Sequence, residues 1–145
     1  MDTAEILIRI ATSVDLAELA RLNAAFNGNY ETPEDLAQRI AAPHCVETPI
    51  VALLGEQAVG FAAVRVVPRV FYAAPYGELT ELYVEPDFRG LGVARQLVAY
   101  AERLAKDMGV EELFVLTGPD NEAALALYHC MGYMDNDLAL SKSLS

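Results

Sequence analysis

The feature that most constrains this chain is a glycine-containing turn near its middle, Arg-Gly-Leu-Gly-Val-Ala at residues 89–94. A strand-like apolar run, residues 79–84, leads into the turn, and a helical pattern, residues 93–108, follows it. Two glycines let the backbone approach a ligand closely, and the unpaired amides at the start of a helix favour an anion. A phosphate group fits such a turn, although the same residues would also serve to reverse the chain.

The spacing of this turn excludes two common phosphate-binding motifs. A P-loop places Lys and then Ser or Thr after its last glycine, and no such pair is present here. A dinucleotide-binding motif needs a small residue at position 95, where Arg95 stands, and it normally follows the first strand of a doubly wound sheet. The turn therefore needs another explanation.

The chain alternates between strand-like and helix-like segments, and we expect an α/β fold in one domain, residues 1–145. A chain of this length can bury about 68–70% of the surface that it exposes when unfolded. The predicted sheet is mixed, and only its last two β-α-β units are typical of parallel crossovers. The predicted strands are residues 6–11, 49–54, 58–67, 79–84, 113–116 and 133–140. The predicted helices are residues 12–26, 33–42, 93–108 and 121–131.

Composition narrows the possible partners and location. The formal net charge of −11 disfavours a polyanion, so we expect no nucleic-acid partner. No apolar run reaches the roughly 18 residues of a membrane span, and residues 1–5 are acidic where a signal peptide is basic, so we expect no membrane partner and a cytoplasmic location. Cys45 and Cys130 stand alone in sequence, which favours buried thiols over a disulfide, a metal site or a nucleophile.

Two motifs together resemble the GCN5-related N-acetyltransferase (GNAT) family. The first is Arg-x-x-Gly-x-Ala at residues 89–94, directly after Leu-Tyr-Val-Glu-Pro at residues 82–86. The second is Asn-x-x-Ala-x-x-x-Tyr at residues 121–128, followed by Gly132 and Tyr133. The resemblance implies a single-domain fold with a mostly antiparallel mixed sheet, helices on both faces, and a splayed parallel pair at residues 79–84 and 113–116. It also implies an N-acetyltransferase that uses acetyl-CoA.

The resemblance places acetyl-CoA between the splayed strands. It implies that backbone groups near Leu82 and Val84 pair with the pantetheine arm, that amides of the glycine turn hold the pyrophosphate, and that Tyr128 protonates the departing thiolate. A backbone N–H near Leu82 or Tyr83 would polarise the acetyl carbonyl. The expected cofactor-binding residues are Leu82, Tyr83, Val84, Arg89, Gly90, Leu91, Gly92, Val93, Ala94, Arg95, Asn121, Ala124 and Tyr128.

Acyl transfer to an amine needs the neutral amine, and a primary amine with a pKa of about 10 is neutral only about one part in a thousand at pH 7. Glu78 and Glu81 are the candidate bases. Many family members place their catalytic glutamate at the position of Glu78, which we favour, and some antibiotic-modifying members place an acid at that of Glu81. Strict alternation puts the two on opposite faces of a strand unless a bulge intervenes. A water relay without a single base stays open.

The acceptor in this family is set by the first two helices and by the loop before the third of the central strands, here residues 26–40 and 69–77. Their acids and aromatic residues suit a small cationic amine, and an aminoglycoside antibiotic is our leading hypothesis. The alternatives are a protein, peptide or amino-acid N-acetyltransferase and, in another class, a non-catalytic acyl-CoA sensor. Many relatives pair through C-terminal strands, so residues 133–140 could form a homodimer. The expected substrate-binding residues are Asn29, Tyr30, Glu31, Tyr72, Tyr76 and Glu78.

Overall fold

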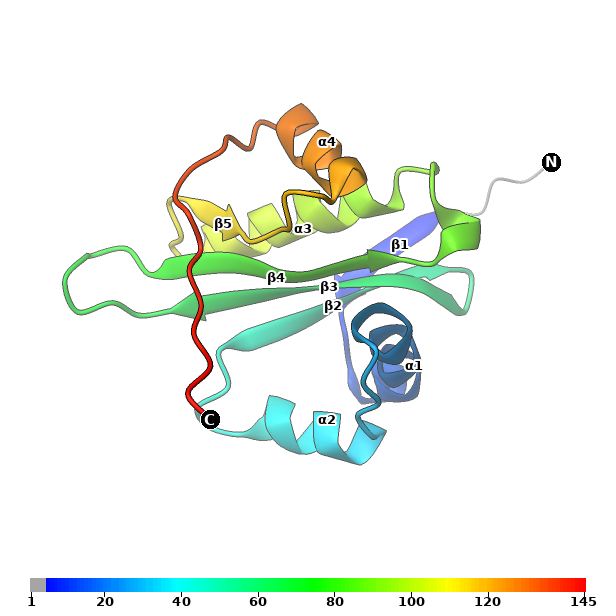
Figure 1. The fold of residues 1–145 in the computed structure, drawn as a ribbon. Helices are drawn as coiled ribbons and strands as arrows, with labels where there is room; N and C mark the ends of the chain where they lie inside the picture. Colours follow the sequence, from blue (N-terminus) through cyan, green and yellow to red (C-terminus); the bar gives the residue numbers. More distant parts are fainter. Residues whose placement is uncertain (1–4) are drawn as a thin grey trace. The chain divides into compact units, whose positions relative to one another are not determined.

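A sheet in the order β1-β2-β3-β4-β5 organises the structure, a computed structural model that describes residues 5–145 (Figure 1). Strands β1 to β4 are antiparallel neighbours, and β5 runs parallel to β4. This sheet confirms the predicted fold class. The acidic start of the chain, residues 1–4, lies outside the described residues. The strands are β1 (Ile6–Ile10), β2 (Glu47–Leu54), β3 (Gln57–Val67), β4 (Tyr76–Val84) and β5 (Leu113–Val115).

The chain divides into two compact units, Met1–Phe114 and Val115–Ser145. In the first unit, helices α1 (Leu16–Asn27) and α2 (Pro33–Ala41) cover one face of the sheet, and α3 (Val93–Asp107) covers the other (Figure 1). The second unit contains helix α4 (Glu122–Cys130). Within residues 5–145, every helix is too short or too polar to cross a membrane.

Helices α1 and α3 bury the faces that their sequence periodicity predicts. Leu16, Leu19 and Leu22 of α1 form a buried cluster with Val51 and Phe61 of the sheet. On the opposite face, the buried side chains of α3 include Leu97, Val98 and Ala101. Spacings of three and four residues place each set on one side of its helix. These two layers hold the central strands β3 and β4 in a fixed position.

A β-bulge in β4 decides which acidic side chains share a face. In the pairing of β3 with β4, Ala63 lies opposite Glu81 and Val64 lies opposite Leu79, so Thr80 is an extra residue on β4. Arg65 lies opposite Glu78. Ala63 and Arg65 are two residues apart and point to the same side of β3. Glu78 and Glu81 therefore lie on the same face of β4. Strict alternation would place them on opposite faces, and the bulge removes that separation.

The predicted final strand is wrong. Residues 133–140 have no strand assignment, and Met134, Leu138 and Leu140 are 86%, 89% and 91% exposed. The segment is apolar at both ends, but three consecutive polar residues, Asp135 to Asp137, interrupt it and disfavour extended pairing. A strand also needs hydrogen bonds from a neighbouring strand. The described sheet therefore has one parallel crossover, β4-α3-β5, where the sequence predicted two. The side chains of strand β5 are half-buried.

The prediction of buried thiols is also wrong, because Cys45 and Cys130 are both exposed. Cys45 lies in the connection between α2 and β2, so it has no apolar face of an element to pack against. Cys130 is the last residue of α4, where a side chain has fewer helical neighbours than in the middle of the helix. The isolated positions of the two cysteines in the sequence argued against a disulfide, a metal site or a nucleophile. They contained no information on whether the two thiols are buried.

Candidate active site

The glycine turn between β4 and α3 has the geometry of an anion site. Gly90 and Gly92 have φ values of 79° and 83°, in the left-handed region that side chains rarely adopt. A Cβ at either position would meet no atom within 4 Å, so the backbone conformation alone requires glycine. Gly92 is the N-cap of α3, and among the described residues no side chain caps it. The first-turn amides are therefore available to a ligand.

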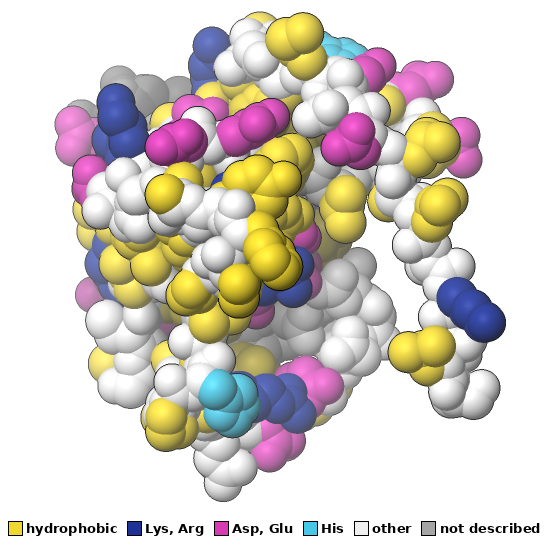
Figure 2. Space-filling model, turned by 90° about the vertical axis from the view of Figure 1, so that its left-hand side faces the viewer, with side chains coloured by type: hydrophobic (Ala, Val, Ile, Leu, Met, Phe, Trp, Pro, Cys, Tyr) yellow, Lys and Arg dark blue, Asp and Glu magenta, His cyan; other side chains and the backbone are white. Residues whose placement is uncertain are grey.

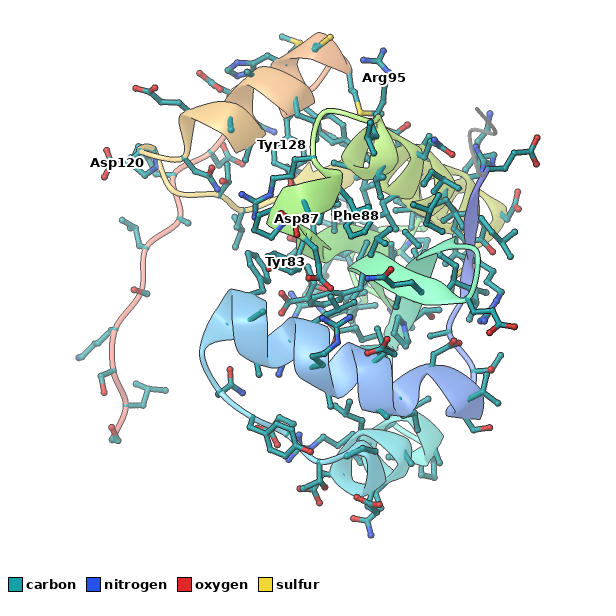
Figure 3. All side chains as sticks on the ribbon, turned by 90° about the vertical axis from the view of Figure 1, so that its right-hand side faces the viewer. Tyr83, Asp87, Phe88, Arg95, Asp120 and Tyr128 are labelled. Atoms are coloured by element: carbon teal, nitrogen blue, oxygen red, sulfur yellow. The ribbon has the colours of Figure 1, made fainter. Side chains whose placement is uncertain are left out.

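The two arginines that flank this turn have different surroundings. Arg89 folds back, its Nε donating to the backbone oxygen of Val84 at 2.9 Å, with its guanidinium carbon 5.8 Å from the centre of the Tyr83 ring. Arg95 lies on the first turn of α3 and points away from the ribbon (Figure 3). Arg89 thus links the end of β4 to the start of the turn. The first turn of α3 contains no acidic residue, which keeps this end attractive to anions.

Strand β5 is too short to pair with all of β4. The ring of Phe114 stacks on that of Tyr76, at 5.3 Å between centroids and 13° between planes, so β5 lies beside the first part of β4. A three-residue strand spans about 10 Å, and β4 has nine residues. Leu82, Tyr83 and Val84 are therefore beyond the reach of β5, and this edge leads directly to the glycine turn.

An acidic groove of about 550 Å³ lies on the α1 and α2 side of the sheet. Three carboxylates, Glu31, Glu47 and Glu81, line it together with one cation, Arg39, whose Nη1 is 2.9 Å from Glu31 Oε2. The other lining side chains are apolar, amide or thiol. They are Leu19, Asn23, Asn27, Asn29, Leu36, Ile40, Cys45, Pro49, Phe61 and Ala63. The groove therefore combines an apolar floor with a net negative charge.

Glu81 is the carboxylate that β4 contributes to the acidic groove. Burial raises the pKa of Glu81 above the ordinary value for glutamate, a hydrogen bond from Asn27 opposes the increase, and the charge of Glu47 adds to it. In that hydrogen bond Asn27 Nδ2 donates to Glu81 Oε2 at 3.2 Å. A carboxylate with a raised pKa is a stronger base than an exposed one. Glu81 can therefore accept a proton from a group bound in the groove.

Glu78 has a different environment on the same face. It is 8% exposed, and its Oε1 accepts from Arg65 Nη2 at 3.0 Å and from the Tyr76 hydroxyl at 2.9 Å. Burial and the neighbouring carboxylate raise the pKa of Tyr76, so its phenol stays protonated and able to donate. Glu78 does not line the acidic groove. Its charge is already compensated by Arg65.

The predicted substrate residues fall into four places. Asn29 and Glu31 line the acidic groove, and their contact with a substrate stays a prediction. Tyr76 and Glu78 form the pair described above, and Tyr30 is largely exposed outside the groove. Tyr72 lies in the β3–β4 connection, with the guanidinium carbon of Arg69 4.3 Å from its ring centre. Figure 2 faces the tip of this hairpin, where hydrophobic side chains gather on the surface.

Several residues of the acidic groove were not predicted from the sequence, among them Asn23 and Glu47. Asn27 lies within the predicted acceptor segment, residues 26–40, but was not among the expected substrate-binding residues. Asn23 and Asn27 are four residues apart on α1, next to its apolar positions, and this spacing was a visible signal. Glu47 lies opposite Arg65 across β2 and β3, and Thr80 Oγ1 donates to its Oε2 at 2.6 Å. Such a cross-strand contact depends on a register that the sequence does not state.

The second unit contains the remaining predicted site residues. Tyr128 is buried, and this burial raises the pKa of its phenol. Its ring lies 5.6 Å from that of Tyr133. Asn121 Oδ1 accepts from the amide of Ala124 at 3.4 Å and so caps α4, which is one of the two roles that we considered for it. Contact of Tyr128, Asn121 and Ala124 with the cofactor stays a prediction.

A mixed sheet with a glycine turn between β4 and α3 is the arrangement that the resemblance to the N-acetyltransferases implies. The profile of the acetyltransferase (GNAT) family matches residues 15–133, and the chain belongs to this family. It is therefore an N-acetyltransferase that uses acetyl-CoA. The open amides at Gly92 and the edge of β4 fit the pyrophosphate and the extended arm of that molecule.

Several known proteins resemble the chain over nearly its whole length. An aminoglycoside N(6')-acetyltransferase type 1 from Stenotrophomonas maltophilia is 32% identical over 136 residues, which cover 90% of this chain and 87% of the relative. The solved aminoglycoside N-acetyltransferase AAC(6')-Iy in complex with CoA has a TM-score of 0.84 at 22% identity, covering 98% and 96% of the two chains. A ribosomal-protein-alanine N-acetyltransferase from Brucella melitensis biovar Abortus 2308 has a TM-score of 0.82 at 18% identity, covering 96% and 99%. The fold is thus common to proteins whose names indicate different acceptors.

Proposed function

We propose that this enzyme transfers the acetyl group of acetyl-CoA to a primary amine of a small cationic acceptor, most specifically an aminoglycoside. The acidic groove supports this proposal above all, because Glu31, Glu47 and Glu81 surround an apolar floor. Such a surface attracts an ammonium ion and also accommodates the ring of an amino sugar. The 32% identical relative is named for the same class of acceptor. A cytoplasmic location, where acetyl-CoA is supplied, is part of the proposal.

In the proposed mechanism, acetyl-CoA supplies an activated acetyl thioester. Glu81 accepts the proton that the acceptor ammonium must lose before its nitrogen can attack, and its raised pKa suits it to this role. We propose Glu81 ahead of Glu78, because Arg65 and Tyr76 already use the Glu78 carboxylate. Tyr128, kept protonated by burial, is the proposed donor to the departing sulfur.

An amino-acid or peptide acceptor is the second candidate, and Arg39 is the observation that favours it. A guanidinium in the groove is a natural partner for a carboxylate of the acceptor. However, Arg39 is already 2.9 Å from Glu31. A non-catalytic sensor would have no need for a carboxylate with a raised pKa in the groove. These points rank the small cationic amine first.

The test is acetyl-CoA-dependent thiol release with aminoglycosides, polyamines, amino acids and basic peptides, with the product mass checked for added acetyl groups. We expect turnover with an aminoglycoside, a loss of about a hundredfold or more in Glu81→Gln, and a smaller loss in Glu78→Gln. Glu34→Gln is the matched control, because Glu34 is an exposed acid of α2 that does not line the groove. Turnover only with amino acids or peptides would reverse the ranking of acceptors, and full activity of Glu81→Gln would reject its role as base.

A further inference from the structure

A short chain of amide hydrogen bonds ends on the Glu81 carboxylate. Asn27 Nδ2 donates to Glu81 Oε2 at 3.2 Å and to Asn23 Oδ1 at 2.8 Å. Asn23 Nδ2 in turn donates to the backbone oxygen of Asn29 at 3.1 Å. This series of hydrogen bonds therefore connects the loop after α1 to β4 through two side chains on the last turns of α1.

The groups at the two ends of this hydrogen-bond series determine which amide atoms donate and which accept. A backbone carbonyl and an ionised carboxylate can only accept hydrogen bonds. Asn23 must therefore direct its nitrogen to Asn29 and its oxygen to Asn27, and Asn27 must direct its nitrogen to both Asn23 and Glu81. Both hydrogens of the Asn27 amide are used. Within residues 5–145, this bond reaches Oε2 of Glu81, and no described group donates to Oε1.

We propose that Asn27, held by Asn23, is a positioning residue that binds one oxygen of Glu81 and leaves the other directed to the acceptor amine. This inference rests on the proposed role of Glu81 as base. The amide donates to the ionised form of the carboxylate, so it orients Glu81 and also limits the increase of its pKa that burial causes. Asn27 acts on the reaction through Glu81 and needs no contact with acetyl-CoA.

Other charged groups face Glu81 from each neighbouring element, and the test must leave them unchanged. Glu47 of β2 raises the pKa of Glu81. Glu31, Arg39 and the Cys45 thiol line the same groove from α2 and its flanking loops. On the strands, Arg65 and Glu78 neutralise each other at 3.0 Å. Substitutions confined to α1 alter none of these groups.

The first experiment is an NMR titration of the Glu81 side-chain carboxyl carbon in the full chain, with the resonance assigned by its loss in Glu81→Gln. In Asn27→Leu, which removes the donor and keeps the number and branching of the side-chain heavy atoms, we expect the titration midpoint to move to higher pH. Asn27→Asp replaces a donor by an acceptor and should move it further in the same direction. Asn23→Leu should cause a smaller movement, because it only releases Asn27. Midpoints unchanged in folded Asn27→Leu and Asn27→Asp would overturn the proposal.

Ala25→Leu is the matched control, because Ala25 is an exposed residue of the same helix that does not line the groove. We expect it to leave the midpoint and the rate unchanged, and a shift equal to that of Asn27→Leu would assign the effect to the helix and overturn the proposal. In Asn27→Leu, kcat/KM should fall about tenfold at pH 7, with a larger loss at pH 6 than at pH 8. Full activity of Glu81→Gln would reject the base, whereas the NMR midpoint tests the contact between Asn27 and Glu81 by itself.

Discussion

The two ends of helix α1 each meet a carboxylate, and the two carboxylates have opposite environments. At the first end Asp15 is 6% exposed, and its oxygens accept from both terminal nitrogens of Arg9, one of them at 2.9 Å, and from the Thr12 amide at 2.7 Å. At the last end Glu81 accepts one hydrogen bond from Asn27 and lines the acidic groove. Both side chains lose water, but only Asp15 receives full compensation.

This difference gives the two pKa values opposite directions. The hydrogen bond from Arg9 is the largest influence on Asp15, and it lowers the pKa of Asp15 despite the burial of the carboxylate. Burial is the largest influence on Glu81, and it raises the pKa of Glu81. A lowered pKa means that the ionised form stabilises the fold, and a raised pKa means that it costs stability. Asp15 is thus a structural carboxylate, whereas Glu81 is available for chemistry.

The largest effect should come from exchanging each carboxylate for its amide and measuring turnover. We expect Glu81→Gln to lower kcat/KM about a hundredfold and to remove the acid limb of the pH profile, which in the wild type lies above the ordinary range of a glutamate. Asp15→Asn, assayed where it is folded, should keep the limb and most of the rate. An acid limb that survives in Glu81→Gln would show that another group titrates.

The second-largest effect concerns the free energy of unfolding, for which replacing Asp15 should matter more than replacing Glu81. Asp15→Asn should lower the free energy of unfolding by about 2 kcal/mol at pH 7, because it weakens a buried charged contact with Arg9. Since the pKa of Asp15 is lowered, its contribution is present above the ordinary value for aspartate and disappears as pH falls through the folded value. Urea unfolding of both proteins from pH 7 down to pH 3 should show the gap closing, and a gap independent of pH would contradict the assignment.

A smaller effect of opposite sign is expected for Glu81→Gln in the same unfolding experiment. Because the pKa of Glu81 is raised, the wild type should lose stability as pH increases from the ordinary glutamate value through the folded one. Glu81→Gln removes this cost, so its free energy of unfolding should exceed that of the wild type by up to about 1 kcal/mol at pH 7. The two proteins should be equally stable near pH 4. A lower free energy of unfolding for Glu81→Gln than for the wild type at neutral pH would contradict the conclusion that ionised Glu81 costs stability.

The smallest effect should come from Glu47→Gln. The charge of Glu47 raises the pKa of Glu81, so its removal should move the acid limb of the rate profile to lower pH. We expect the rate at pH 7 to change less than about threefold, because Glu81 keeps its burial and its bond to Asn27. Raising the salt concentration should reduce the displacement of the limb. An acid limb that moves to higher pH would contradict the conclusion that the charge of Glu47 raises the pKa of Glu81.

Local patterns predicted most of the fold and the glycine turn. The Pro33 start of α2 was predictable because Thr32 caps that helix through the Asp35 amide at 3.1 Å. Gly90 and Gly92 were predictable because a left-handed backbone strongly favours glycine. Such signals lie within a few residues of one another. The conformation of the glycine turn was therefore predictable from the sequence.

The acidic groove and the final segment were less visible, because they depend on contacts between distant residues. Glu47, Asn27 and Glu81 meet only when β2, α1 and β4 are assembled in one register. No local sequence pattern predicts the bulge in β4, where Thr80 is the extra residue. Residues 133–140 have apolar residues at both ends but no strand pairing, so local sequence gave the wrong answer there.

The bulge at Thr80 also has a consequence for how such an enzyme can change over time. It puts two acidic positions, 78 and 81, on one side of β4, where an unbroken strand would separate them. If the proposed base is confirmed, substitutions around Arg65 and Tyr76 are enough to transfer its role from one position to the other without rebuilding the sheet. Loss of the single residue at position 80 would end this interchangeability, because one carboxylate would then turn toward α3.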